Sequence, residues 1–308
     1  MRKVVVIGGG SGSYLVLKGL KEYPLQIYSI VSMFDSGGST GKLRDQLGVL
    51  PPGDVRRCLI ALADDDHENI LRELFMFRFE GGVENHSLGN LILTAAEQNY
   101  GNLAEGIKKL SQVLNLKGTV LPVSLDNAQL CAQLADGTVI KGETNIDIPE
   151  GERAKIEKVF LEPPAKLNSE AAEAIREADL IVIGPGDLYT SLIPNMLVEG
   201  IQEALAESKA KIAYVCNLMT KKGETDGFRV SDFVNEIENY LPRPVDHIIC
   251  NENHISRMSL ERYRLNNQFP VVFDMAEDQR AIVAELIDQP DVVRHNLRKL
   301  AHELVRLC

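Results

Sequence analysis

Short runs of aliphatic residues alternate along this chain with longer segments in which apolar positions recur every three to four residues. A run of about four to eight Val, Ile and Leu residues predicts a strand buried on both faces, and the longer periodicity predicts an amphipathic helix. The predicted strands are residues 3–7, 25–32, 117–123, 128–134, 137–142, 156–161, 179–183, 211–217, 246–250 and 270–273. The predicted helices are residues 13–22, 54–63, 67–77, 87–99, 102–114, 168–178, 195–208, 230–240, 254–266 and 291–306. This alternation predicts an α/β fold with a mostly parallel sheet and helices on both of its faces.

The region around residues 117–161 departs from that alternation. Two short apolar segments flank Asp136-Gly137 there. An Asp-Gly pair between two such segments is a strong signal for a β-hairpin. We therefore predict an antiparallel elaboration in this region. Because no repeat, low-complexity tract or linker divides the chain, residues 1–308 are interpreted as a single domain.

Three predicted strands end directly in loops rich in glycine and hydroxyl side chains. The loops run from Gly8 to Ser13, from Asp35 to Lys42 and from Gly184 to Ser191. Glycine lets the backbone turn sharply and approach a ligand closely. Hydroxyl groups, free backbone N–H groups and the start of a following helix can then bind an anion, most often phosphate. Three such loops predict a site for a nucleotide or another phosphate-bearing ligand.

Neither standard phosphate-binding motif is complete in these loops. The dinucleotide fingerprint needs a third glycine where Ser13 stands, although Asp35 has the place of the ribose-binding acid. The Walker A pattern needs glycine at Ser36 and a hydroxyl residue at Leu43. A packing turn in the first loop and a hinge in the second remain the alternatives. The pattern favours a modified cradle for a nucleotide diphosphate over a standard NAD or ATP site.

Other polar residues give weaker indications. Asn217 ends a predicted strand, on the rim where open α/β sheets bind ligands. Asp54 is interpreted as a helix cap rather than as a catalytic acid. We find no metal-ligand spacing among His, Asp and Glu, and no nucleophile elbow in a strand–turn–helix context. We therefore predict no metal ligands.

The composition narrows the class of protein. The content of 44% hydrophobic and 25% charged residues is that of an ordinary soluble globular protein. No apolar run approaches the length of a membrane span, and the N-terminal run makes a better first strand than a signal peptide. The five cysteines are scattered without a CxxC pair, which favours the cytoplasm. The net charge of −11 disfavours nonspecific binding to nucleic acid or an anionic membrane.

Several segments together resemble the gluconeogenesis-factor family of bacteria, a CofD-like group whose enzyme relative is 2-phospho-L-lactate transferase. They are, in order, VVVIGGGSGS, SMFDSGGSTGKLR, LPPGDVRRCLIAL, HSLGNL, IGPGDLYTSLIPN, VCNLMTKKGETDGF, RYR and VRHN. The resemblance implies a modified Rossmann-like, three-layer α/β/α sandwich in a cytoplasmic protein. It also implies binding of a UDP-sugar such as UDP-N-acetylglucosamine, and a role in cell shape during growth on gluconeogenic carbon sources.

The resemblance further implies which residues bind the nucleotide. Those on the family's loop motifs are Gly8, Gly9, Gly10, Ser11, Gly12, Asp35, Ser36, Gly37, Gly38, Ser39, Thr40, Asn90, Gly184, Pro185, Gly186 and Asn217. Tyr263 and Arg294 resemble positions implicated in holding the nucleotide sugar. Tyrosine can stack on a base and arginine can pair with a diphosphate, whereas the alternative for both is an ordinary helix surface.

One departure from the transferase pattern weakens an enzymatic interpretation. The transferase relatives carry an Asp-rich stretch for metal and acceptor where this chain has only Asp35. Asp187 also stands where many relatives carry a small polar residue, and an acid on the third loop disfavours phosphate binding there. We therefore predict a regulator that binds a UDP-sugar and needs no obligatory cofactor. The alternative is a Mg²⁺-dependent transferase that acts on a phosphate-bearing nucleotide donor, with Asp35 as the candidate catalytic residue. An NAD-type oxidoreductase ranks third, and homo-oligomers and protein partners are left open.

Overall fold

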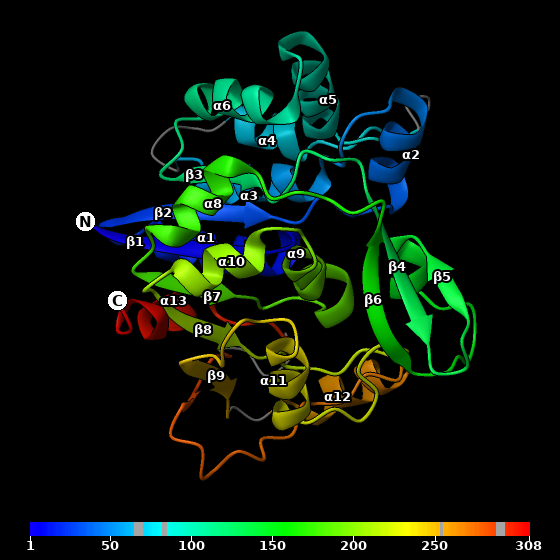
Figure 1. The fold of residues 1–308 in the computed structure, drawn as a ribbon, viewed down its shortest axis with the longest axis vertical. Helices are drawn as coiled ribbons and strands as arrows, with labels where there is room; N and C mark the ends of the chain where they lie inside the picture. Colours follow the sequence, from blue (N-terminus) through cyan, green and yellow to red (C-terminus); the bar gives the residue numbers. More distant parts are fainter. Residues whose placement is uncertain (65–69, 82–84, 253–254, 288–292) are drawn as a thin grey trace.

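The computed structural model describes residues 1–64, 70–81, 85–252, 255–287 and 293–308 (Figure 1). Within these residues, seven strands form one sheet in the spatial order β10-β9-β8-β7-β1-β2-β3, and all neighbouring strands are parallel. The strands are β1 (Arg2–Gly8), β2 (Leu25–Val31), β3 (Thr119–Pro122), β7 (Leu180–Ile183), β8 (Lys211–Val215), β9 (His247–Asn251) and β10 (Ala281–Ala284). The buried residues 4–7 of β1 and all of β7 are aliphatic, as expected for strands that helices cover on both faces.

Helices pack on both faces of this sheet, which confirms the predicted three-layer α/β/α fold. One face carries α1 (Gly10–Leu20), α3 (Gly53–Leu62) and α13 (Leu297–Val305). The opposite face carries α8 (Ser169–Arg176), α9 (Ile193–Met196), α10 (Ile201–Glu207) and α11 (Val230–Glu238), in front in Figure 1. Beyond β3 lie α4 (Ile70–Met76), α5 (Leu88–Tyr100) and α6 (Leu103–Val113).

A small antiparallel sheet stands beyond the carboxyl ends of β1 and β2 (Figure 1). It contains β4 (Gln129–Leu134), β5 (Val139–Lys141) and β6 (Ile156–Glu162), in the order β5-β4-β6. The predicted hairpin turn is confirmed, and the backbone N–H of Thr138 donates to Asp136 at 2.9 Å. The predicted region began at residue 117, but the predicted strand 117–123 contains β3, which pairs with β2 in the main sheet. The antiparallel elaboration therefore begins at Gln129.

Several predicted elements differ from the observed ones. The predicted strand 270–273 forms only isolated bridges, and the edge strand is the half-exposed β10, which was not predicted. The predicted helix 195–208 is divided at Gly200, which adopts a left-handed conformation with φ of 97°. Three short helical segments among the described residues were also not predicted: α2 (Gly38–Leu47), α7 (Glu143–Asp147) and the π-helical turn η1 (Leu188–Leu192). The predicted helices 67–77, 254–266 and 291–306 contain α4, α12 (Arg257–Arg264) and α13, and residues 67–69, 254 and 291–292 lie outside the described residues.

The order of the strands places the three glycine-rich loops side by side. From β1 the chain adds β2 and β3 toward one edge, and β7, β8, β9 and β10 are added toward the other. The sheet therefore has a topological switch point between β1 and β7, where open α/β sheets bind ligands at the carboxyl ends of their strands. The loops after β7, β1 and β2 all open at this point. Among the described helices, none is long and apolar enough to cross a membrane.

Candidate functional site

The first and third loops touch through their backbones. A Cβ atom added at Gly12 would lie 1.7 Å from the carbonyl oxygen of Pro185, so only glycine allows this approach. Helix α1 starts at Gly10, and Gly9 precedes it in an extended conformation without a side-chain cap. The first N–H groups of α1 therefore have no partner within the helix and lie beside the third loop. This is the arrangement that favours an anion at a helix start.

A polar cavity of about 510 Å³ opens between the three loops, α3 and α7. Acidic side chains meet in it from distant parts of the chain. Asp35 follows β2, Asp54 lies in the first turn of α3, and Glu143 begins α7. Asp35 also accepts a hydrogen bond from the backbone N–H of Gly37 at 2.8 Å. We call this space the first cavity.

Burial and mutual repulsion favour the protonated forms of these acids. Burial raises the pKa of Asp35, and burial together with Asp35 raises the pKa of Asp54 to about 6. Burial, then Asp35 and Asp147, raise the pKa of Glu143 to about 7. Asp54 accepts a hydrogen bond from the backbone N–H of Gly10 and does not cap its own helix, so the interpretation as a helix cap was wrong. The carboxyl groups of Asp54 and Glu143 therefore hold part of their protons near neutral pH.

Two neighbouring arginines of α3 supply positive charge to the first cavity. The buried Arg56 donates through Nε to Asn90 Oδ1 at 2.8 Å, and Asn90 Nδ2 donates to Ser39 Oγ at 3.3 Å. The exposed Arg57 donates to the hydroxyl of Ser11. Burial, followed by the charges of Arg57 and Arg78, lowers the pKa of Arg56 to about 10. The first cavity thus contains both carboxyl and guanidinium groups.

A second cavity of about 540 Å³ adjoins the first and is more apolar. It is lined in part by Leu15, Met76, Leu218 and Met219, and the two cavities share Ser11, Gly12, Arg57, Gly186 and Asp187. Tyr263 of α12, Arg294 before α13 and Asn217 after β8 also line it. Burial lowers the pKa of His295, on the same wall, to about 4, so its ring is neutral at physiological pH.

The structure gathers most of the predicted site residues around these two cavities. The first is lined by Gly9, Gly10, Ser11, Gly12, Asp35, Gly37, Gly38, Ser39, Thr40, Asn90 and Gly186. The second is lined by Ser11, Gly12, Pro185, Gly186, Asn217, Tyr263 and Arg294. Gly8, Ser36 and Gly184 line neither, and the hydroxyl of Ser36 instead accepts a hydrogen bond from the backbone N–H of Thr144 at 3.0 Å.

Several residues of the first cavity were not predicted from the sequence. Arg56 and Arg57 follow Asp54 after one intervening residue, and this group of charges after Pro-Gly was the available signal. Glu143 and Asp147 gave no signal, because α7 reaches the cavity only through the small sheet. In the part of the chain that the structure describes, no group of three His, Cys, Asp or Glu side chains could hold a metal ion.

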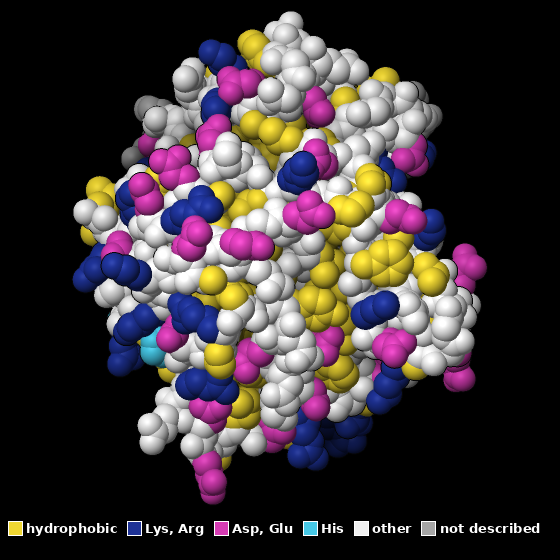
Figure 2. Space-filling model, viewed as in Figure 1, with side chains coloured by type: hydrophobic (Ala, Val, Ile, Leu, Met, Phe, Trp, Pro, Cys, Tyr) yellow, Lys and Arg dark blue, Asp and Glu magenta, His cyan; other side chains and the backbone are white. Residues whose placement is uncertain are grey.

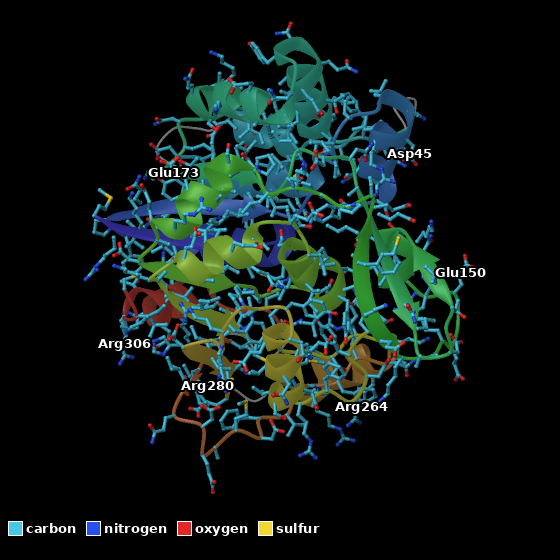
Figure 3. The ribbon with its side chains drawn as sticks, in the orientation of Figure 1. Asp45, Glu150, Glu173, Arg264, Arg280 and Arg306 are labelled. Carbon is cyan, nitrogen blue, oxygen red and sulfur yellow. The ribbon has the colours of Figure 1, made fainter. Side chains whose placement is uncertain are left out.

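On one face of the molecule the charged side chains are mixed in sign. On the face shown in Figure 2, acidic and basic side chains are interspersed over α8 and α10. Figure 3 labels charged residues around the rim, among them Glu150 beside the small sheet and Arg264 on α12. Carboxyl and guanidinium groups come together in the first cavity, at the loops of the switch point.

Comparison with known proteins gives concordant results. Residues 4–290 match the family model described as 2-phospho-L-lactate transferase CofD. The gluconeogenesis factor of Halalkalibacterium halodurans is 42% identical over 313 residues, covering 99% of this chain and 96% of that protein. The gluconeogenesis factor of Bacillus subtilis is 41% identical over 317 residues, covering 99% and 98%. A crystal structure of a upf0052 family member from Bacillus halodurans superposes with a TM-score of 0.93 at 42% identity, over 99% of this chain and 100% of the other.

Proposed function

Because the chain belongs to the CofD family, and within it to the gluconeogenesis factors, we propose that it is a cytoplasmic regulator that binds a UDP-sugar such as UDP-N-acetylglucosamine. The observation that carries this proposal is the pair of adjoining cavities of different chemistry at the switch point between β1 and β7. Both volumes lie in the range of ligand sites, about 300–1,000 Å³. A ligand with one aromatic end, a charged centre and one hydroxyl-rich end matches this sequence of environments.

The second cavity fits the nucleotide end of such a ligand. Tyr263 offers a ring on which a base can stack, and the aliphatic side chains around it exclude water from that face. Arg294 offers a planar guanidinium that can pair with phosphate in a bidentate way. The diphosphate would then lie against the start of α1, beside Ser11 and Gly12, which both cavities share.

The first cavity fits the sugar end. A sugar hydroxyl needs both donors and acceptors, and the cavity wall presents Ser39, Thr40, Asn90 and the carboxyl groups beside them. Partly protonated acids can donate as well as accept, which suits an uncharged polyol better than a second phosphate. Binding in both cavities would connect α1, α3, α12 and the small sheet through one molecule. We propose that this connection makes the control of cell shape depend on the concentration of the nucleotide sugar during growth on gluconeogenic carbon sources.

Thermal shift measurements with a ligand panel test the proposal, because a ligand that binds only the folded state raises the melting temperature. The panel contains UDP-N-acetylglucosamine, UDP, ADP-glucose, NAD and inorganic pyrophosphate. We expect the largest shift with UDP-N-acetylglucosamine. Tyr263→Ala should reduce that shift strongly, whereas Tyr100→Ala, on the exposed end of α5, should leave it unchanged. Absence of a shift with every UDP-sugar at millimolar concentration would contradict the proposal.

A Mg²⁺-dependent transferase is the second candidate, and one observation favours it. The carboxyl groups of Asp35 and Asp54 lie near enough that the charge of Asp35 raises the pKa of Asp54. Proteins usually bind Mg²⁺ through one or two carboxylates, with substrate phosphates and waters completing the shell. Asp35 and Asp54 fit that mode of binding, although the described residues offer no third protein ligand. Bound there with a phosphate-bearing donor, Mg²⁺ would neutralise charge that develops during transfer.

In that alternative, Arg56 and Arg57 would orient the phosphates and the first cavity would hold the acceptor. Incubation with nucleotide donors and Mg²⁺, followed by chromatography of the nucleotides, would detect turnover. Turnover that disappears in Asp35→Asn while binding persists would favour the transferase. Binding of UDP-N-acetylglucosamine without consumption, with or without Mg²⁺, would favour the regulator.

A further inference from the structure

Asp187 poses an electrostatic problem for any phosphate-binding site at the switch point. It lies directly after Gly186 on the third loop and lines both cavities. Its side chain is 43% exposed. Asp147 of α7 lines the first cavity a short distance away. Two unpaired carboxylates, one on the wall that both cavities share and one in the first cavity, would repel the diphosphate of a nucleotide.

Lys221 offsets one of these two negative charges. Its ammonium group lies 2.8 Å from Asp187 Oδ2, 3.3 Å from Glu224 Oε1 and in direct contact with Asp147. The Lys221 side chain is only 19% exposed and that of Glu224 is fully buried. Burial disfavours the charged form of Lys221, but the charges of Glu224, Asp187 and Asp147 outweigh it and raise its pKa. The ammonium group is thus a fixed positive charge between the loops.

Glu224 adds little negative charge to this cluster at neutral pH. Its burial raises its pKa to about 8, in spite of the opposing effect of Lys221. One cation then faces the carboxylates of Asp147 and Asp187, and its loss would leave the two acids unpaired at the cavity wall. Lys221 lines the second cavity itself, so the charge stands where a ligand would pass from one cavity to the other.

Lys221 is not needed to hold the surrounding segments together. Arg153 donates to the carbonyl oxygens of Ile146 at 2.6 Å and Gly223 at 2.9 Å, and so connects α7 to the loop that carries Lys221. The hydroxyl of Thr190 also lies 3.4 Å from Asp147 Oδ1. Removing the ammonium group should therefore change the charge of the wall more than its shape.

We propose that Lys221 is a positioning residue for phosphate: by offsetting one of the two negative charges of Asp187 and Asp147 it makes the wall between the two cavities able to accept the diphosphate of a nucleotide sugar. This inference rests on the proposed function and names a residue that determines its specificity for phosphorylated ligands. Lys221 acts on the ligand through Asp187, so the charge of the pair matters and the lysine itself does not need to touch the phosphate.

Titration calorimetry with UDP-N-acetylglucosamine, and competition by uridine, test this role. Lys221→Met should weaken binding of UDP-N-acetylglucosamine by about tenfold or more, because two like charges are exposed to the diphosphate. Binding of uridine, which has no phosphate, should be unchanged. Lys222→Met removes the same charge from the exposed neighbouring position and should leave both affinities unchanged.

The double variant Lys221→Met, Asp187→Asn distinguishes an effect of Lys221 through the charge of Asp187 from direct binding of the phosphate by Lys221. If Lys221 acts through Asp187, the double variant recovers most of the affinity for UDP-N-acetylglucosamine. If the double variant stays as weak as the single one, Lys221 binds the phosphate directly and the inference is wrong. A parallel loss of uridine affinity would show a merely structural role and would also overturn it.

A second variant keeps the test valid should Lys221→Met fail to fold. Asp187→Asn alone keeps the lysine, removes one acid and should bind UDP-N-acetylglucosamine as tightly as the natural sequence or about threefold more tightly. Weaker binding by Asp187→Asn would contradict the inference. Natural protein that binds no nucleotide would refute the proposed function, whereas tight binding by both natural protein and Lys221→Met would refute only the role of Lys221.

Discussion

The two cavities at the switch point differ in where their walls come from along the chain. The first is built mainly from the loops after β1, β2 and β7 and from the start of α3. The second takes Tyr263 and Arg294 from the last fifth of the chain and places them against the first loop. The first is polar and holds acids with raised pKa values, whereas the second is more apolar and holds a neutral histidine. The difference suggests that one cavity selects the sugar and the other selects the nucleotide.

The largest effect is expected at the junction that both cavities share. Gly12→Ala would place a methyl group against the carbonyl oxygen of Pro185, and neither backbone can yield cheaply. We expect a loss of about 3 kcal/mol or more in the free energy of unfolding, and loss of ligand binding in both cavities. Urea denaturation measures the first and calorimetry the second. Ser11→Ala, at the adjacent position, adds no atoms and should leave the free energy of unfolding unchanged. A Gly12→Ala variant as stable as the natural protein would contradict this prediction, because it would show that the two loops can separate.

His295 in the second cavity should make the protein less stable in acid. The pKa of His295 is about 4 in the folded state and 6.5 in the unfolded chain, so the unfolded state binds the extra proton. Stability from this group is complete above pH 6.5 and falls as the pH drops toward 4, by up to about 3 kcal/mol. His295→Asn should remove that pH dependence, measured as the difference in unfolding free energy between pH 7 and pH 4. His302→Asn, exposed on α13, is the matched control and should leave it unchanged.

Glu143 in the first cavity should change the stability with pH in the opposite direction, so that the protein loses stability as the pH rises. The pKa of Glu143 is about 7 in the folded state and 4.5 in the unfolded chain, so the folded state holds the proton longer. Its contribution therefore weakens as the pH rises from 4.5 through 7, by about 2 kcal/mol once solvent screening of a half-buried group is allowed for. Glu143→Gln should be stabilised relative to the natural protein at pH 8 but not at pH 4.5. Glu150→Gln, at the rim of the same small sheet (Figure 3), should show no such trend.

The sequence predicted the scaffold better than it predicted the charges on it. The aliphatic runs located β1, β2 and β7, and the glycines after them located the three loops, because both signals are local. Helix α2 was missed because glycine and serine at its start are typical of a loop. Asp54 and Glu143 meet in the first cavity, and Lys221 meets Asp147 and Asp187, only through tertiary contacts, so no spacing in the sequence relates them. Tyr263 and Arg294 were identified only through resemblance to a family, and the structure brings both to one cavity wall.

The smallest expected effect separates the two cavities most sharply. Ser39 lines only the first cavity, where its hydroxyl accepts a hydrogen bond from Asn90. Ser39→Ala removes one weak interaction with a sugar hydroxyl, so we expect affinity for UDP-N-acetylglucosamine to fall about threefold, equivalent to less than ~1 kcal/mol. Affinity for UDP should not change, because UDP would leave the first cavity empty. Ser11→Ala should instead weaken both ligands equally, since Ser11 lines both cavities. Equal weakening of UDP and UDP-N-acetylglucosamine by Ser39→Ala would mean that the nucleotide itself occupies the first cavity, and the assignment of the two cavities would have to be reversed.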